Sequence, residues 1–237
     1  QAFSKRAPWV LDWLYALATG LDRKIMVRLV KGAYWDAEIK RAQVLGLTGF
    51  PVFTRKANTD LSYLACAKQI LAMNDRIYAQ FATHNAHSVA AILHLAGSDH
   101  AYEFQRLHGM GESLHASVMA QGGIRCRVYA PVGAHQDLLA YLVRRLLENG
   151  ANSSFVHQLV SPEIAPETIA QDPVNVVLER LDQGLSCSSH AIVQPKDLFG
   201  QDHGNSRKNA KGWDITDSPT VESMESERVY LAQEYWQ

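Results

Sequence analysis

Two cations and two aromatic rings gather in the segment Arg28–Trp35, which reads RLVKGAYW. The segment completes a short, largely apolar strand that we predict over Ile25–Val30. Its cations supply fixed positive charge, and the small pair Gly32 and Ala33 allows a ligand to approach the backbone closely. These residue types suit the binding of an anionic, planar cofactor. The alternative is a strand end with ordinary solvated charges.

Polar side chains also follow three later strands where each is predicted to end. Ligands of parallel sheets and of barrels bind at the carboxyl ends of the strands, so these edges predict a site. His84, His87 and His108 lie at equivalent edges, but their spacing matches no usual zinc motif and no carboxylates cluster with them, so we expect no metal. The edges read ATHNAH over 82–87, QRLHGMG over 105–111 and YAPVG over 129–133.

A helix predicted over Ala134–Glu148 has an apolar face and a polar face. The polar face collects Tyr141, Arg144, Arg145 and Glu148, which are neighbours at helical spacing. Two adjacent guanidinium groups beside a ring can hold a small carboxylate and cover its apolar part, as an amino-acid substrate requires. The alternative is a solvated face with an exposed ion pair. The apolar face carries Leu138, Leu139, Leu142, Val143, Leu146 and Leu147.

Short strand-like runs alternate with longer helix-like runs as far as about residue 155, which predicts an α/β fold with a parallel sheet and crossover helices. The predicted strands are Ile25–Val30, Ile77–Thr83, Tyr102–Leu107 and Arg125–Ala130. The predicted helices are Ser4–Leu21, Trp35–Leu45, Thr59–Met73, His87–Leu95, Glu112–Gln121 and Ala134–Glu148.

The region 158–237 differs in character from the region 1–157, because prolines interrupt it and its polar stretches are longer. We predict a linker or extension there, with one helix-like piece over Val174–Leu185 and a mobile surface segment over Ser206–Gly212. The domain boundary is therefore expected at about residue 157.

Composition narrows the class of protein. Lys and Arg total 23 against 24 Asp and Glu, so the net charge of −1 indicates neither nucleic acid nor an anionic membrane as a partner. No apolar run approaches the roughly 18 residues of a membrane span, and the beginning of the sequence lacks a signal pattern. Three cysteines without metal-ligand spacing predict reduced thiols. A cytoplasmic enzyme is expected.

Four segments together resemble the proline dehydrogenase family, and most closely its bacterial form, which is fused to an aldehyde dehydrogenase. They are RLVKGAYW over 28–35, FATHNAH over 81–87, EFQRLHGMGE over 103–112 and YLVRRLLENG over 141–150. The resemblance covers residues 1 to about 157 almost continuously. The remainder looks like the connector toward the aldehyde dehydrogenase domain, which this chain lacks.

The resemblance implies a (β/α)8 TIM-like barrel that binds FAD, oxidises L-proline to 1-pyrroline-5-carboxylate in the catabolism of proline, and passes electrons to a quinone. It also implies a bifunctional parent that forms homo-oligomers and associates peripherally with the membrane during turnover. The chain begins at what resembles the end of the fourth strand. We therefore expect a fragment that holds the C-terminal half of the barrel, lacks an aspartate and a lysine of the family's site, and exposes strand edges.

Site residues follow from the same resemblance, which implies hydride transfer from the ring carbon next to the nitrogen of proline to the flavin. Arg144 and Arg145 are implied to hold the proline carboxylate, and Tyr129, Tyr141 and Leu107 to enclose its ring. The residues implied to bind FAD are Gln1, Arg28, Val30, Lys31, Gly32, Ala33, Trp35, Thr83, His84, Asn85, Gln105 and Glu148.

Two other functions remain open from the sequence. The first is a pyridoxal-phosphate barrel that uses Lys31 as the Schiff base, with Arg28 and the arginine pair binding phosphate and carboxylate. The second is an inactive fragment that acts only by association with a partner chain.

Overall fold

The computed structural model describes residues 1–98, 101–150, 163–200 and 207–233, without the side chains of 148–150 and 166. It divides into two compact units. The sheet unit comprises residues 1–33 and 55–188, and the tail unit comprises residues 34–54 and 189–237. Two stretches of sequence far apart along the chain therefore build the tail unit.

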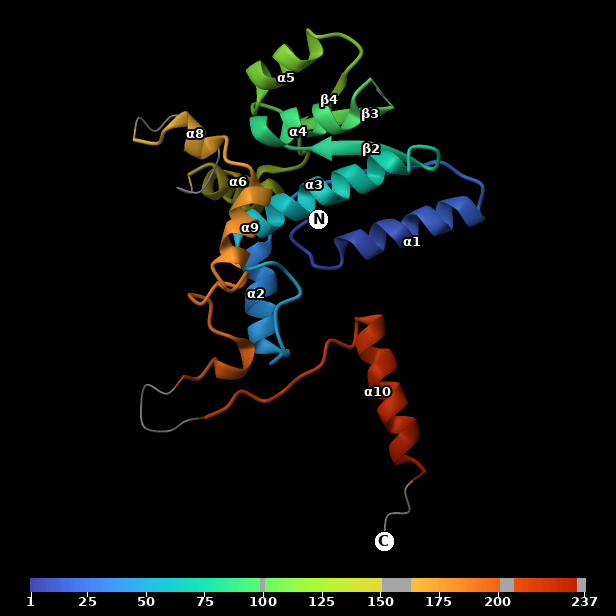
Figure 1. The fold of residues 1–237 in the computed structure, drawn as a ribbon, viewed down its shortest axis with the longest axis vertical. Helices are drawn as coiled ribbons and strands as arrows, with labels where there is room; N and C mark the ends of the chain where they lie inside the picture. Colours follow the sequence, from blue (N-terminus) through green and yellow to red (C-terminus); the bar gives the residue numbers. More distant parts are fainter. Residues whose placement is uncertain (99–100, 151–162, 201–206, 234–237) are drawn as a thin grey trace. The chain divides into compact units, whose positions relative to one another are not determined.

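The sheet unit contains a four-stranded parallel sheet in the order β1-β2-β3-β4 (Figure 1). The strands are β1 (Ile25–Leu29), β2 (Ile77–Ala82), β3 (Tyr102–Leu107) and β4 (Arg125–Tyr129). This order confirms the predicted α/β class with a parallel sheet. All carboxyl ends meet at one edge, because each neighbouring pair is parallel.

The helices of the sheet unit match the predicted ones within a few residues, except that the short helix α8 was not predicted. Helix α3 begins earlier than expected, because Arg55 is extended and the backbone turns at Lys56. Asn58, just before the predicted start, lies inside the helix, where its side-chain amide donates to the Cys187 carbonyl at 3.0 Å. The helices are α1 (Ala7–Gly20), α3 (Lys56–Ala72), α4 (Ala86–Ala96), α5 (Glu112–Met119), α6 (His135–Gly150), α8 (Pro166–Ile169) and α9 (Pro173–Asp182).

One side of the sheet forms the hydrophobic core. Alternate strand residues point to it, and Phe81 and Phe104 are completely buried there. The ring of Tyr102 meets both edge-on, with centroids 5.6 and 5.7 Å away. Helix α3 packs against β1 and β2 and also contacts α1, α4 and α9 (Figure 1). We call this side the helix-covered face.

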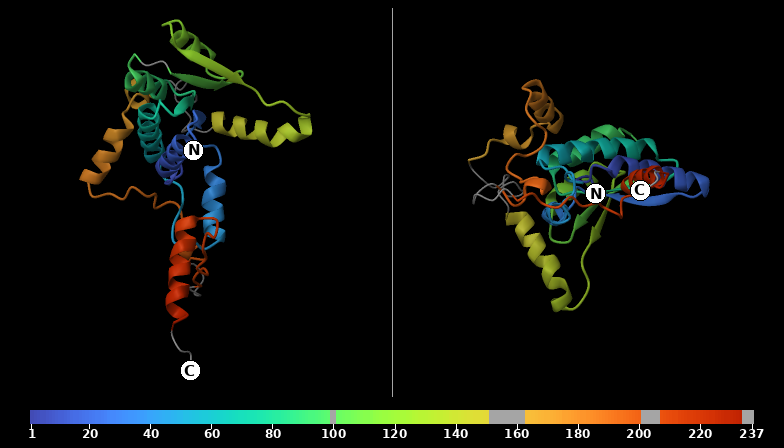
Figure 2. Two further views of the ribbon diagram at one scale, coloured as in Figure 1. Left: turned by 90° about the vertical axis from the view of Figure 1, so that its right-hand side faces the viewer. Right: turned by 90° about the horizontal axis from the view of Figure 1, so that it is seen from below.

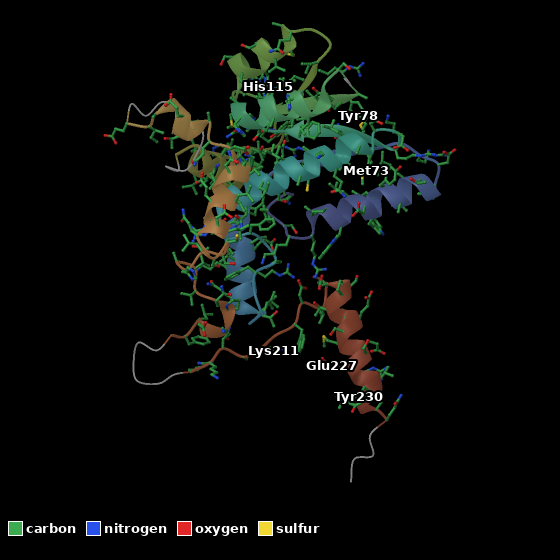
Figure 3. The ribbon with its side chains drawn as sticks, in the orientation of Figure 1. Met73, Tyr78, His115, Lys211, Glu227 and Tyr230 are labelled. Atoms are coloured by element: carbon green, nitrogen blue, oxygen red, sulfur yellow. The ribbon has the colours of Figure 1, made fainter. Side chains whose placement is uncertain are left out.

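The tail unit contains α2 (Trp35–Val44), the short helix η1 (Pro195–Asp197) and α10 (Ser218–Leu231). The prediction of a mobile segment at Ser206–Gly212 is wrong for its described residues, 207–212. Asn209 donates its side-chain amide to the carbonyls of Gln43 and Pro195, both at 2.9 Å. The backbone N–H of Gly212 also donates to the carbonyl of Gly46 at 3.0 Å, which joins the two segments of the tail unit. Lys211, labelled in Figure 3, lies over the ring of Trp213.

Helix α10 is absent from our sequence-based expectations. Its start carries a clear signal, since Asp217 caps it by accepting from the backbone and hydroxyl of Thr220 and a proline follows in the first turn. Apolar residues are sparse in α10, and none of its residues is buried, which explains why periodicity did not reveal it.

Three further features concern the cysteines, membrane-spanning helices and metal ligands. The three cysteines are free thiols, as predicted. Within the described ranges, no helix is both long enough and apolar enough to cross a membrane. In the same ranges, no three His, Cys, Asp or Glu side chains gather in a way that suits a metal ion.

Candidate functional site

The second side of the sheet is polar where the first is apolar. Register places Arg28 beside Gln80 and places Gln105 beside Arg127, so their side chains share this side. Tyr78 of β2, labelled in Figure 3, belongs to the same set because it precedes Gln80 by two residues. We call this side the polar face. Its carboxyl edge is where a parallel sheet binds ligands.

Arg28 and Tyr129 come together across the polar face from the outer strands β1 and β4. The guanidinium carbon of Arg28 lies 4.7 Å from the centroid of the Tyr129 ring. Sequence reasoning assigned Arg28 to a cofactor and Tyr129 to a substrate ring. The structure brings both to one place, where a positive charge stands beside an aromatic surface.

Glu103 lies at the centre of the polar face and is only 4% exposed. Arg127 binds it with two hydrogen bonds, Nε to Oε1 at 2.7 Å and Nη2 to Oε2 at 2.9 Å. The amides of Gln80 and Gln105 both donate to Oε1, at 2.9 and 3.0 Å. The hydrogen bonds from Arg127 hold the pKa of Glu103 below its usual value. The carboxylate of Glu103 is therefore charged, and both of its oxygens accept hydrogen bonds.

His84 follows β2 at the carboxyl edge and is held as a neutral ring. The backbone N–H of Leu107 donates to His84 Nε2 at 2.9 Å, which leaves the ring proton on Nδ1. Burial, together with the nearby ring of His115 and the positive charges of Arg145, Arg106 and Arg28, lowers the pKa of His84 to about 4. His84 therefore offers a neutral N–H donor.

Lys31 follows the end of β1, and an aspartate of α3 holds its ammonium group. Its ammonium donates to Asp60 at 2.5 Å, and Lys56 binds the other oxygen of the same carboxylate at 2.6 Å. Burial lowers the pKa of Lys31 although Asp60 opposes the shift. The two lysines keep the pKa of Asp60 below its usual value against the effect of burial. The buried hydroxyl of Tyr63 has no partner among the described residues, and the ring of Tyr63 lies 5.6 Å from Lys31 Nζ.

Helix α6 turns its polar face inward. Its apolar residues Leu146 and Leu147 are 71% and 63% exposed, whereas Tyr141, Arg144 and Arg145 are half-buried. The guanidinium of Arg145 lies 5.2 Å from the Tyr141 ring, and its charge reaches His84. Both views of Figure 2 show α6 well separated from α3 and α4. The side chain of Glu148, and with it the predicted pair with Arg144, lies outside the described part.

The residues that follow β1 have structural roles of their own. Gln1 is brought beside Val30, because the next residue, Ala2, donates its N–H to the Val30 carbonyl at 2.8 Å. Gly32 has a φ of +125°, and a side chain there would overlap the ring of Phe3. Packing within the protein thus already requires glycine at this position. Ala33 ends the segment and is half-buried.

Three further predicted residues are held by local hydrogen bonds. The buried Thr83 offers its carbonyl to Nε2 of His115 of α5, at 3.0 Å (Figure 3). Asn85 caps α4, since its side-chain oxygen accepts from the backbone N–H of Ser88 at 2.9 Å. Trp35 belongs to the tail unit, where its indole donates to the Phe53 carbonyl at 2.5 Å. Thr83 and Asn85 therefore shape the carboxyl edge.

Sequence reasoning missed four polar residues of this region: Asp60, Gln80, Glu103 and Arg127. A signal was present for three of them. Gln80 and Glu103 lie between buried residues of their strands, Arg127 lies between apolar residues of β4, and a charge at such a position needs a partner. Asp60 gave no signal, because an acidic residue in the first turns of a helix is common.

The donor set suits a planar, anionic cofactor. Arg28 supplies a positive charge and His84 an N–H donor at the carboxyl edge, while the Tyr129 ring supplies an apolar surface. The buried hydroxyl of Tyr63, which has no partner among the described residues, belongs to a ring 5.6 Å from Lys31 Nζ, after the end of β1. The two acidic side chains described in this region, Glu103 and Asp60, are both paired with cations.

Comparison with known proteins places the chain in a family. The family model of proline dehydrogenase matches residues 1–158. The bifunctional protein PutA of Escherichia coli is 52% identical over the whole of this chain, which spans 18% of that protein. Proline dehydrogenase 1 of Bacillus subtilis is 32% identical over 66% of this chain and 49% of its own length.

Solved structures agree with these relatives. A crystal structure of a mutant of proline utilization A from Bradyrhizobium japonicum matches 96% of this chain with a TM-score of 0.85 and 49% identity. The match covers 23% of that protein. The chain therefore spans about a fifth of the length of the bifunctional proteins that it matches.

Proposed function

The chain belongs to the proline dehydrogenase family, and from that premise we propose that it is part of an FAD-dependent enzyme that oxidises L-proline to 1-pyrroline-5-carboxylate. The observation that supports this most is that Arg28 and His84 lie at the carboxyl edge of a parallel sheet, where the charge of Arg145 of α6 also acts on His84. These three side chains come from distant parts of the sequence, and all are donors. An anionic cofactor and an anionic amino acid both require such donors.

The flavin is proposed to bind at the polar face, held by Arg28, Lys31, His84 and Gln105. When bound, FAD would supply the ring that accepts a hydride from the substrate. Lys31 presents a charge whose position Asp60 fixes. His84 remains neutral at physiological pH, since its pKa is about 4, and so offers a hydrogen bond without adding charge.

The substrate is proposed to bind under the polar face of α6. Arg144 and Arg145 would hold the proline carboxylate, because guanidinium groups match carboxylates in shape and charge. Tyr129, Tyr141 and Leu107 would enclose the pyrrolidine ring. Orientation by such groups can lower a barrier by roughly 7–11 kcal/mol. The stacking of Arg145 on Tyr141 supports this proposal, since it fixes one guanidinium in place.

The wider assignments rest on the bifunctional relatives. We propose that residues 1–157 form the C-terminal half of a (β/α)8 barrel and that residues 158–237 lead toward an aldehyde dehydrogenase domain of a longer, oligomeric parent. A quinone is the proposed electron acceptor, reached by peripheral contact with a membrane. The pyridoxal-phosphate alternative loses support, because the ammonium of Lys31 is held by Asp60.

The test is spectroscopic. The purified chain is incubated with FAD, separated from free flavin and mixed with L-proline without oxygen. We expect a protein-bound flavin spectrum that bleaches on addition of proline. Bound flavin that does not respond would contradict the substrate assignment, and absence of bound flavin would contradict the proposal that this chain holds the cofactor by itself.

A matched pair of arginine variants locates the substrate. Arg144→Met is expected to raise the KM for proline at least tenfold while flavin stays bound, because one carboxylate ligand worth roughly 1.5–3 kcal/mol is lost. Arg125→Met makes the same change at the exposed start of β4, at the opposite edge of the sheet, and should leave the KM unchanged. Equal KM values in all three proteins would refute the role of Arg144.

A further inference from the structure

The Glu103 network fixes the direction of two amide side chains. A carboxylate can only accept hydrogen bonds, so Gln80 and Gln105 must both point their NH₂ groups at it. The carbonyl oxygen of each amide therefore points away from Glu103. Among the described residues, no donor reaches the carbonyl oxygen of Gln105. The polar face consequently presents acceptors at these positions, beside the cations Arg28 and Arg127.

The orientation is enforced by charge and burial. Glu103 is 4% exposed, and its Oε1 accepts from Arg127 Nε as well as from both amides. A buried carboxylate that lost these donors would be left incompletely bonded, which is unfavourable. Rotation of the Gln105 amide by half a turn would place its oxygen against the carboxylate. That arrangement is repulsive, so only one orientation remains.

We propose that Glu103 is a positioning residue that makes Gln105 a hydrogen-bond acceptor for the cofactor. Because an acceptor selects a donor, the ligand must present an N–H or O–H group to Gln105. The imide N–H of a flavin ring and the hydroxyls of its ribityl chain are groups of this class. The inference rests on the proposed flavin function, but the orientation of the amide exists without any ligand.

The first test needs no flavin. The side-chain amide signals of Gln105 in the ¹⁵N-labelled chain are identified by their loss in Gln105→Leu and then compared between wild type and Glu103→Gln. The substitution replaces one acceptor oxygen with a donor, so the Gln105 signals should move. Glu112→Gln, at an exposed site on the helix-covered face, should leave them in place. Unmoved Gln105 signals in Glu103→Gln would overturn the positioning role.

The second test is a double-mutant cycle on FAD affinity. Glu103→Gln and Gln105→Leu should each weaken FAD binding about tenfold, as expected for one hydrogen bond to a buried group. The double variant should bind no more weakly than Gln105→Leu, because Glu103 acts through Gln105. Losses that multiply to about a hundredfold would show that Glu103 acts independently, and they would overturn the inference.

Two outcomes separate this inference from the proposed function. If wild type binds no FAD, the proposed function fails for this chain, and the amide signals alone decide whether Glu103 positions Gln105. If Glu103→Gln loses its circular dichroism signal, Glu103→Asp takes its place. Aspartate keeps the charge but is one methylene shorter, so it withdraws the acceptor from Gln105 and should produce the same shift of signals and the same loss of affinity.

Discussion

The two faces of the sheet differ in what they contribute. The helix-covered face packs the aromatic rings of Phe81, Tyr102 and Phe104 in complete or nearly complete burial. The polar face carries Arg28, with Tyr129 beneath its guanidinium, and the network around Glu103. Apolar burial stabilises folds, whereas a charged and aromatic surface is retained for binding. This difference predicts that substitutions on the helix-covered face change mainly stability, whereas substitutions on the polar face change mainly ligand binding.

The largest expected effect is on the helix-covered face. Phe104→Ala should lower the free energy of unfolding by about 3–5 kcal/mol, because it empties a site between Tyr102, Phe81 and His115. Chemical denaturation followed by circular dichroism measures the change. The matched change on the polar face is Met26→Ala, at a side chain that is 66% exposed, and it should cost less than about 1 kcal/mol. Similar losses in the two variants would contradict the division of roles.

The helix-covered face is also the part that the sequence predicts best. Alternation of apolar residues located all four strands within one residue of their observed ends, since side chains buried on a sheet must recur every second position. Apart from the short α8, the helices of the sheet unit were predicted from their own periodicity. Helix α10 did not, because it buries no face and leaves only its Asp217 cap to be recognised.

The polar face was predictable only in part. Arg28, His84 and Gln105 were identified because they lie at strand ends in motifs of a known family. Glu103 was not predicted as part of the site. Its partners Gln80 and Arg127 lie on neighbouring strands, so they can be identified only when the register of the strands is known. The hydrogen bonds of Asn209 were not predicted for the same reason. Their acceptors are the carbonyls of Gln43 and Pro195, which are distant from Asn209 in the sequence.

The second prediction concerns the pH dependence of stability. Folding lowers the pKa of His84 from 6.5 to about 4, first through burial and then through nearby positive charges. Between these values the unfolded chain binds more protons, so His84 makes the fold less stable as the pH falls from about 6.5 to 4. Partial exposure reduces the effect to about 1–2 kcal/mol. Urea unfolding at pH 7.5 and pH 5 measures it.

A histidine control isolates this contribution. His84→Gln should show a smaller loss of stability between the two pH values than wild type, because glutamine does not titrate. His94→Gln changes an exposed histidine of α4 and should keep the pH dependence of wild type. If His84→Gln and wild type lose the same stability on acidification, the neutral state assigned to His84 is wrong.

The substitution Arg28→Met is expected to have the smallest effect on stability but a large effect on flavin binding. Arg28 is exposed, and its stacking on Tyr129 is worth about 0.5–1 kcal/mol in such a position, so Arg28→Met should change the free energy of unfolding by no more than that. Flavin binding should weaken at least tenfold, because the guanidinium is one of the two positive charges that the end of β1 offers to an anion. Fluorescence titration with FAD measures the affinity, and Arg125→Met should match wild type in both measurements. A variant that loses stability while binding flavin normally would show that Arg28 belongs to the fold, and the polar face would then share in stability as the helix-covered face does.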